Sequence, residues 1–205
     1  MANCGCREAG CHHLNLEDRR IGAWLETISG VRFYPADPRS DEVRIEDIAH
    51  ALSRQCRFGG HVRDHYSVAQ HSVLVSLNVP PHDALAALLH DAAEAYVVDL
   101  PSPVKWILRD AAKAGGVPCW YDQIEARTWE AISERFGVSN VLPKSVKVAD
   151  MRALFTERRD LRPLTAALWE DQEEYPPFDE PLRAMGCEEA RVAFLARFSA
   201  LGGMS

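Results

Sequence analysis

The sequence predicts an all-α fold, a single helical bundle with at most a small β-hairpin near residues 31–44. Apolar residues recur at three- and four-residue steps through most of the chain after Ile45, which is the period of a helix with one buried face. Only residues 31–34 form the short β-branched and aromatic run of a strand. A chain of 205 residues suits one compact domain. We therefore expect a helical domain over residues 21–205, preceded by a Cys- and His-rich extension over residues 1–20.

Start and stop signals place the helices along this domain. A first helix should begin at Ile45, after a turn region rich in Pro and Asp, and end at the Gly59-Gly60 pair. Ser67 is a suitable N-cap for a second helix over residues 68–77. The broadest apolar face belongs to a third helix over residues 83–98. Further helices are expected after the Pro101/Pro103 pair and over residues 121–136, 144–159 and 188–201, with a surface loop over residues 170–181.

Composition excludes several classes of protein. Apolar residues make up 47% and charged residues 26%, which is ordinary for a globular chain and unlike a disordered or fibrous one. No apolar run approaches the roughly 20 residues that a membrane-spanning helix needs. The net charge of −7 disfavours a sequence-independent grip on nucleic acid. We therefore expect neither a membrane nor a nucleic-acid polymer as a partner.

The N-terminal residues lack the apolar stretch of a secretory signal, and the six cysteines do not form a dense disulfide framework. Both observations favour a cytoplasmic protein. Five potential zinc ligands gather at this end of the chain: Cys4, Cys6, Cys11, His12 and His13. Their spacing is irregular and no second zinc-binding pair follows, so a loose or merely packed tail is the alternative, and their role stays open.

Four potential metal ligands occupy helix positions that face apolar neighbours. His71 and Asp150 each have apolar residues three or four positions away on both sides, and His90-Asp91 follow directly after a pair of leucines. An inward carboxylate costs several kcal/mol unless it is paired or bound to a cation. Two imidazoles and two carboxylates can bind a divalent metal while leaving positions for water and substrate. Taken singly, each has another explanation: a buried histidine satisfied by hydrogen bonds, or an Asp150 paired with Lys147.

Other polar residues surround this set. Glu94 follows His90 by four residues, so it projects on the same side of the helix and can accept a proton from water. Asp99 and Lys105 lie in a Pro-stiffened segment at the end of that helix. Arg57 precedes Phe58, and a guanidinium beside a ring suits a phosphate below a base or sugar. Without these neighbours, Glu94 and Arg57 would be read as surface charges and Phe58 as a core residue.

These motifs resemble those of the HD-domain metal-dependent phosphohydrolases, whose signature is H…HD…D. The segment from His90-Asp91 through Glu94 and Asp99-Leu-Pro-Ser-Pro-Val-Lys105 is similar to the HD…E…DLPTPVK segment of the bacterial 5′-deoxynucleotidases. Val-Ala-Gln-His71-Ser and Val-Lys-Val-Ala-Asp150 resemble two further motifs of that branch, which includes phage enzymes that remove triphosphate from dATP. The resemblance extends over residues 45–160.

The resemblance implies a role for each matching residue. His71, His90, Asp91 and Asp150 would bind one divalent ion, either Zn, Co, Mn, Fe or Mg, and a second Mg or Mn could accompany the substrate. Glu94 would orient or deprotonate water, Asp99 would assist beside the sugar, and Arg57, with Lys105, would contact phosphate. Phe58 replaces the usual Trp, which puts strict selection against ribonucleotides in doubt. The family also implies a homo-oligomer, either a dimer or a larger ring.

The expected reaction is hydrolysis of a deoxynucleotide at its 5′ phosphoester. Cationic and donor side chains in or near the motifs favour a triphosphate, and these are Arg54, Arg57, Arg63, Lys105, Lys147, His61 and His65. The resemblance to the phage enzymes puts dATP first. The products would be the deoxynucleoside and tripolyphosphate. A deoxynucleoside 5′-monophosphatase is the main alternative, and a non-catalytic nucleotide sensor is a further one that the presence of Glu94 disfavours.

Overall fold

The computed structural model describes residues 20–163, 169 and 171–203. Within these residues the fold is all-α with one two-stranded hairpin, as the sequence predicts. The cysteine- and histidine-rich cluster of the first thirteen residues lies outside the described part of the chain. No helix in the described ranges has the length and apolar character needed to cross a membrane.

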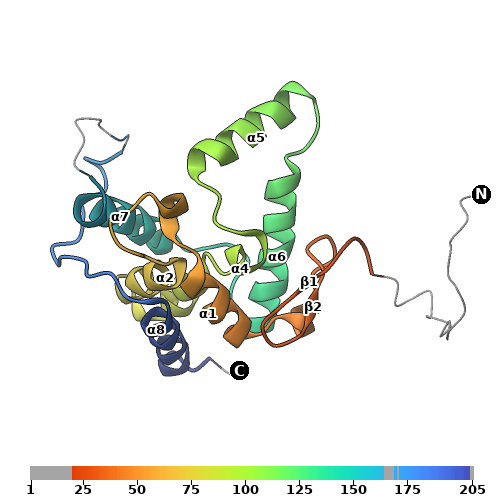
Figure 1. Ribbon diagram of the computed structural model, residues 1–205, viewed down its shortest axis with the longest axis horizontal. Coiled ribbons are helices and arrows are strands. Elements are labelled where there is room, and N and C mark those ends of the chain that lie inside the picture. Colours follow the sequence, from red (N-terminus) through yellow and green to blue (C-terminus); the bar gives the residue numbers. More distant parts are fainter. Residues whose placement is uncertain (1–19, 164–168, 170, 204–205) are drawn as a thin grey trace, which may run out of the picture.

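Eight α-helices and three short 3-10 helices make up the described domain. The α-helices are α1 (Ile45–Arg54), α2 (Val68–Leu77), α3 (Ala84–Leu89), α4 (Glu94–Val97), α5 (Ser102–Ala114), α6 (Trp120–Phe136), α7 (Lys144–Leu161) and α8 (Cys187–Ala200). The 3-10 helices are η2 (Ser40–Glu42), η3 (Arg57–Gly60) and η4 (Pro81–Asp83). Figure 1 shows α1, α2 and α8 side by side at the centre of the bundle, with α7 beyond α2.

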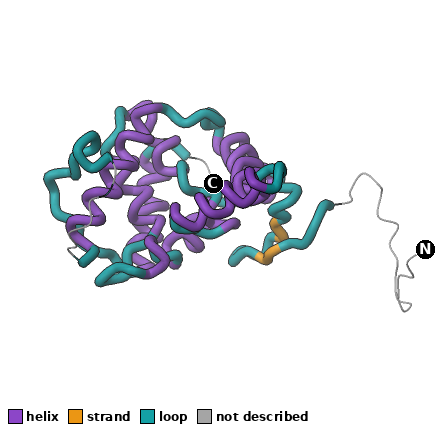
Figure 2. The backbone as a smooth tube through the Cα atoms, turned by 90° about the horizontal axis from the view of Figure 1, so that it is seen from above, coloured by secondary structure: helices purple, strands orange, loops and turns teal. Residues whose placement is uncertain are grey.

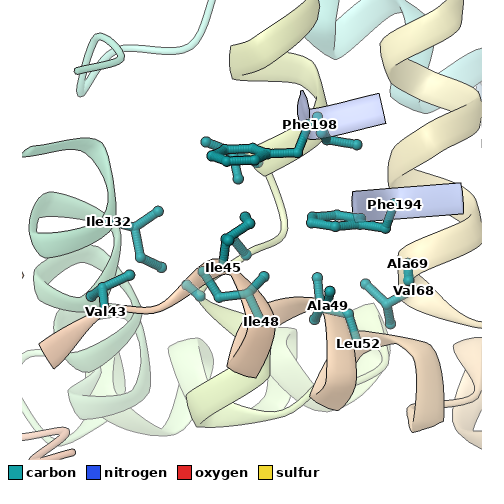
Figure 3. Close-up of a cluster of buried hydrophobic side chains, with 14 of the residues drawn as sticks. Val43, Ile45, Ile48, Ala49, Leu52, Val68, Ala69, Ile132, Phe194 and Phe198 are labelled. Carbon is teal, nitrogen blue, oxygen red and sulfur yellow. The ribbon is translucent and has the colours of Figure 1, made fainter. Parts of the chain in front are cut away.

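The main core forms where α1 packs against α2 and α8. The apolar residues that repeat along one face of α1 are buried against Phe194 and Phe198 of α8 and against Val68 and Ala69 of α2 (Figure 3). Burial of each large apolar side chain contributes roughly 1.5–3 kcal/mol. This packing holds α2 firmly in the middle of the domain.

A second, smaller cluster fixes α7 onto the other side of α2. Val75 of α2 and Ala87 of α3 pack against Val146 and Ala149 of α7, with Phe178 covering the contact. The small side chains on α7 allow its backbone to approach α2 closely. The consequence is that polar residues on facing sides of α2 and α7 lie near each other.

The predicted third helix is interrupted between residues 90 and 93, which corrects a single helix over residues 83–98. Its two parts, α3 and α4, are joined by tight turns in which Ala92 N donates to Leu89 O at 2.8 Å and Glu94 N donates to Asp91 O at 3.0 Å. His90 nevertheless keeps helical backbone angles. The 3-10 hydrogen bonding is compatible with the same apolar pattern over so short a segment, because three and 3.6 residues per turn differ little across four residues.

The first helix and the hairpin also differ from their expected bounds. α1 ends at Arg54 and not at the glycine pair, because Gln55 and Cys56 are extended, Val68 N donates to Gln55 O at 3.1 Å, and Cys56 forms a bridge with Ser67. The hairpin pairs β1 (Leu25–Glu26) with β2 (Arg32–Phe33), so it begins before residue 31 and ends well before residue 44. Figure 2 shows these strands at the edge of the helical body.

Helix α5 stands apart from the bundle at the top of Figure 1. None of its residues is buried, and Trp106 and Ile107 are more than half exposed. Ion pairs from Lys105 and Arg109 to residues of α6 connect it to the next helix. The start of α5 is therefore positioned mainly by charged contacts.

Candidate metal centre

Three elements of the bundle bring together the two histidines and two aspartates that the sequence singles out. His71 comes from α2, Asp150 from α7, and His90-Asp91 from the turn between α3 and α4. His71 Nε2 lies 3.3 Å from Asp150 Oδ1 and 3.5 Å from Asp91 Oδ2. His90 Nε2 lies 3.2 Å from Asp91 Oδ2 and 4.0 Å from Asp150 Oδ1. The four side chains thus converge on one small volume.

The two imidazole rings are oriented by hydrogen bonds on their far sides. His71 Nδ1 lies 2.5 Å from Glu157 Oε1, and His90 Nδ1 lies 2.8 Å from Ala87 O. Both acceptors require a proton on Nδ1, which leaves the lone pair of each Nε2 directed at the carboxylates. Metal-binding histidines in proteins are typically held in this way.

The Nε2 atoms themselves have no hydrogen-bond partner among the described residues, although both are buried. Buried polar atoms normally have a partner, so two unpaired nitrogens facing the same carboxylates need an explanation. Ligand atoms of His71, His90 and Asp150 lie within 4.8 Å of one another. This group can therefore bind a metal ion, and its mixture of nitrogen and oxygen ligands suits several divalent ions.

The charges at this group are strongly coupled. Burial alone would raise the pKa of the two aspartates, but the imidazole of His90 beside Asp91 and that of His71 beside Asp150 hold both pKa values well below their usual range. Burial would lower the pKa of His90, yet the neighbouring Asp91 carboxylate raises it to about 9. Without a bound cation, the two carboxylates therefore attract protons to the histidines, and a dication can replace those protons.

Glu157 is a central residue of the site that the sequence analysis missed. Its side chain is fully buried, with Oε1 on His71 and Oε2 accepting a hydrogen bond from Arg57 Nε at 3.1 Å. Arg57 Nη1 also lies 3.6 Å from Asp91 Oδ2. Glu157 thus connects the phosphate-binding candidate Arg57 to one of the imidazoles. Glu157 follows Asp150 by seven residues, which is about two helical turns. This spacing could have predicted that both side chains lie on the same face of the helix.

Glu94 and Lys105 lie together beside the candidate metal centre. Lys105 Nζ is 3.6 Å from Glu94 Oε1 and 3.0 Å from Glu125 Oε1, while Glu94 Oε2 is buried with no hydrogen-bond partner among the described residues. Burial and the nearby carboxylates of Asp91 and Asp99 raise the pKa of Glu94 well above its usual range. A carboxylate with a raised pKa binds a proton more readily than an ordinary carboxylate does, which suits a proton acceptor.

Asp99 is placed by the backbone and by Gln55, a second residue that the sequence analysis missed. Gln55 Nε2 donates to Glu94 O at 2.9 Å, and Gln55 Oε1 accepts from Asp99 N at 3.0 Å. Between them, Val98 has a φ of 66° and a ψ of 153°, a conformation that costs a β-branched residue about 1–3 kcal/mol. Burial raises the pKa of the Asp99 carboxyl, and the Arg57 guanidinium only partly offsets it. Strain and hydrogen bonding together bring Asp99 near Arg57.

Not all of the predicted cationic residues gather at this site. Arg54 is exposed and donates to His50 O at 3.2 Å on its own helix, and His65 Nε2 lies 3.1 Å from Ser53 O. Lys147 is mostly exposed and lies 3.5 Å from Asp150 Oδ2, the pairing that the sequence leaves as an alternative. Arg57 alone among the predicted arginines contacts the aspartates directly. The positive charge next to the metal group is therefore smaller than the sequence suggests.

Comparisons with known proteins identify two close relatives. The chain is 42% identical over 147 residues to the uncharacterized protein YfdR of Escherichia coli, a match that covers 72% of this chain and 77% of YfdR. It is 34% identical over 197 residues to the uncharacterized protein RCAP_rcc00048 of Rhodobacter capsulatus, covering 87% of this chain and 95% of that protein. No family model matches the chain. From these similarities over most of each sequence, we conclude that the chain belongs to the same family as YfdR and RCAP_rcc00048.

Proposed function

We propose that the protein is an HD-domain phosphohydrolase that cleaves the 5′ phosphoester of deoxynucleotides with the help of a divalent cation. The observation that carries this proposal is the pair of buried, unpaired Nε2 atoms of His71 and His90, which face Asp91 and Asp150 with Arg57 alongside. His71 Nε2 lies 3.3 Å from Asp150 Oδ1 and His90 Nε2 lies 3.2 Å from Asp91 Oδ2, yet neither nitrogen makes a well-aligned hydrogen bond within the described residues, and a shared cation would satisfy all four groups. The resemblance of the surrounding motifs to the 5′-deoxynucleotidase branch supplies the substrate class.

In this proposal the two histidines and two aspartates hold the cation. Zn, Co, Mn, Fe and Mg all accept such ligands. When bound, the cation supplies a positive charge beside the phosphoryl oxygens and lowers the pKa of water. Glu157 and the carbonyl of Ala87 keep the imidazoles in the tautomer that binding requires.

The remaining residues act on substrate and water. Arg57 contacts the phosphate attached to the 5′ oxygen, where it offsets the charge that develops during cleavage. Glu94 accepts the proton of the attacking water at its unpaired Oε2, and Asp99 lies beside the sugar. The water oxygen bonds to phosphorus as the bond to the 5′ oxygen breaks, and the leaving oxygen takes up a proton. The deoxynucleoside and a phosphate product are released.

The first candidate substrate is a deoxynucleoside triphosphate, with dATP foremost, and the product is then tripolyphosphate. The second candidate is a deoxynucleoside 5′-monophosphate, which is favoured by one observation. Lys105 is already paired with Glu94 and Glu125, and Arg54 points elsewhere, so fewer cations adjoin Arg57 than a triphosphate would use. Both candidates require the same cation-binding group.

A product-resolved screen tests the proposal. The purified chain is incubated with each ribo- and deoxynucleoside mono- and triphosphate in the presence of Mn, Co, Mg or Zn, and phosphate is separated from tripolyphosphate. We expect release of a free deoxynucleoside that chelator abolishes and that Asp150→Asn abolishes as well. A matched control is Asp122→Asn, since Asp122 lies on α6 and pairs with Arg109. Absence of any metal-dependent turnover across the panel would refute the proposed function.

A further inference from the structure

A basic pocket lies between the segment that follows Phe58 in the chain and the segment that follows α7. Its volume is about 310 Å³, and its lining residues are His61, Val62, Arg63, Arg162 and Pro163. We call it the Arg63–Arg162 pocket. One wall follows η3 and the other is the C-terminal end of α7, and Arg63 N donates to Leu161 O at 3.0 Å, which ties the two walls together. The pocket is therefore an open hollow between two packed segments.

Arg57 of the candidate site and Arg162 of the pocket both lie near the ring of Phe58. The guanidinium carbon of Arg57 lies 5.5 Å from the centroid of the Phe58 ring, and that of Arg162 lies 4.9 Å from the same centroid. Arg162 also lies 5.2 Å from the ring of Trp169. Contacts of this kind hold a guanidinium in place without neutralising its charge. Phe58 thus has the phosphate-binding candidate Arg57 and the pocket's Arg162 as neighbours.

The backbone at Phe58 turns the chain from one site to the other. Phe58 and Gly59 have φ values of 57° and 60°, which are left-handed conformations that a bulky residue rarely adopts. This turn allows Arg57 to face Asp91 and Glu157, while the residues after Gly60 line the pocket.

The charge of the pocket is unbalanced. None of its lining residues is acidic, and within the described ranges neither Arg63 nor Arg162 has a carboxylate oxygen within 4.0 Å of its guanidinium. By contrast, Arg57, Lys105 and Arg109 are all paired with carboxylates. In a chain with a net charge of −7, two arginines without carboxylate partners and a histidine around one cavity favour an anionic ligand.

We propose that the Arg63–Arg162 pocket binds the terminal phosphates of a nucleoside triphosphate whose first phosphate lies at Arg57. This assignment rests on the proposed function and selects between its two candidates, because a monophosphate has no group that extends past Arg57. The positive charge that a triphosphate needs is then supplied from the α7 end of the site and not from Arg54 or Lys147.

Charge reversal at Arg63 tests this assignment. Arg63 is exposed, so Arg63→Glu should leave the fold intact. Lys113→Glu on α5 is the matched control, because it makes the same change in net charge at an exposed position. We expect Arg63→Glu to raise the KM for dATP about tenfold or more, the loss of one charge-assisted contact, while the KM for dAMP changes less than twofold. Equal changes for dATP and dAMP, or equal effects of the two variants on dATP, would overturn the assignment.

A binding experiment separates failure of this assignment from failure of the proposed function. Inorganic tripolyphosphate is titrated calorimetrically into the full chain without metal and without nucleotide. We expect binding to weaken about tenfold in Arg63→Glu and in Arg162→Gln but not in Lys113→Glu. If this holds while no nucleotide is hydrolysed, the pocket stands and the proposed function fails. If nucleotides are hydrolysed but tripolyphosphate binds all variants equally, the function stands and the pocket assignment fails.

Discussion

Replacing Glu157 by glutamine should weaken metal binding without removing any metal ligand. The buried carboxylate accepts from His71 Nδ1 and from Arg57 Nε, one with each oxygen. Glutamine has the same size but only one acceptor oxygen, so either the imidazole or the guanidinium loses its acceptor. If the imidazole loses it, the tautomer with a free Nε2 lone pair is no longer favoured. If the guanidinium loses it, the buried positive charge of Arg57 keeps only the more distant carboxylate of Asp91, at 3.6 Å, among the described residues.

The magnitude follows from the contacts. Loss of a residue that orients a metal-binding histidine typically lowers metal affinity 10- to 100-fold. Removing one partner of a buried ion pair costs about 3–5 kcal/mol of folding stability, and Glu157 is fully buried. We therefore expect Glu157→Gln to bind Mn or Co about 10- to 100-fold more weakly and to unfold at lower urea concentration.

Competition with a chelator measures the affinity, and urea unfolding of the metal-free chain measures the stability. Asp47→Asn is the matched control, since Asp47 is a buried carboxylate that accepts from Ser29 N and Oγ on another side of the domain. The control should leave metal affinity unchanged. Metal affinity of folded Glu157→Gln within twofold of the parent chain would show that Glu157 does not orient His71.

Three other predictions concern the same site. Glu94→Gln should retain metal affinity while kcat falls at least about 100-fold. Glu125→Gln is the control variant and should not show this loss of kcat. An unchanged kcat in Glu94→Gln would show that Glu94 takes no part in the reaction. Mn at about 100 times its Kd should raise the free energy of unfolding, measured in urea, by about 2.7 kcal/mol. Asp150→Asn should abolish this stabilisation. Equal stabilisation of the parent chain and of Asp150→Asn would show that the ion binds elsewhere. The pKa of His90 is raised to about 9 in the folded metal-free chain, compared with about 6.5 in the unfolded chain. Between these two pH values the folded chain keeps a proton on His90 that the unfolded chain has lost, so protonation favours the folded state less as the pH rises. In chelator, its free energy of unfolding should therefore fall between pH 6.5 and 9, and a rise over that range would contradict the assignment.

Local signals predicted much of the fold. The N-cap at Ser67 and the following helix over Val68–Leu77 are confirmed, with Ser67 Oγ accepting from Gln70 N. α6, α7 and α8 lie within one or two residues of their expected bounds. Such elements were predictable because a cap, an apolar period and a terminating residue are all short-range features.

The interrupted third helix and the end of α1 depend on longer-range contacts. Sequence periodicity cannot distinguish 3-10 from α hydrogen bonding over residues 90–93, so a continuous helix was the wrong prediction. The extended conformation of Gln55 comes from pairing with the start of α2, where Val68 N, thirteen residues further along the chain, donates to Gln55 O. Tertiary pairing of this kind overrides local propensity.

At the site, the sequence could point to polar residues on apolar faces but not to their partners. His71 and Asp150 were found because each stands among apolar neighbours, and their proximity follows from the packing of α2 on α7. Glu157 was missed because a glutamate near the end of a helix next to two arginines resembles a solvated charge. The direction of Arg54, away from the site, depends on side-chain rotamers that no spacing rule fixes.

The exposed position of α5 has a consequence for the motion of the domain. An isolated helix of 13 residues is only marginally stable in water, and α5 has no buried side chain to compensate. Its amide protons should therefore exchange with solvent sooner than those of α1 or α2, through local opening that leaves the bundle folded. Each opening would separate Lys105 from Glu94. Fraying of α5 would therefore remove the positive charge beside the Glu94 carboxyl group while the side chains of the candidate metal centre stay in place.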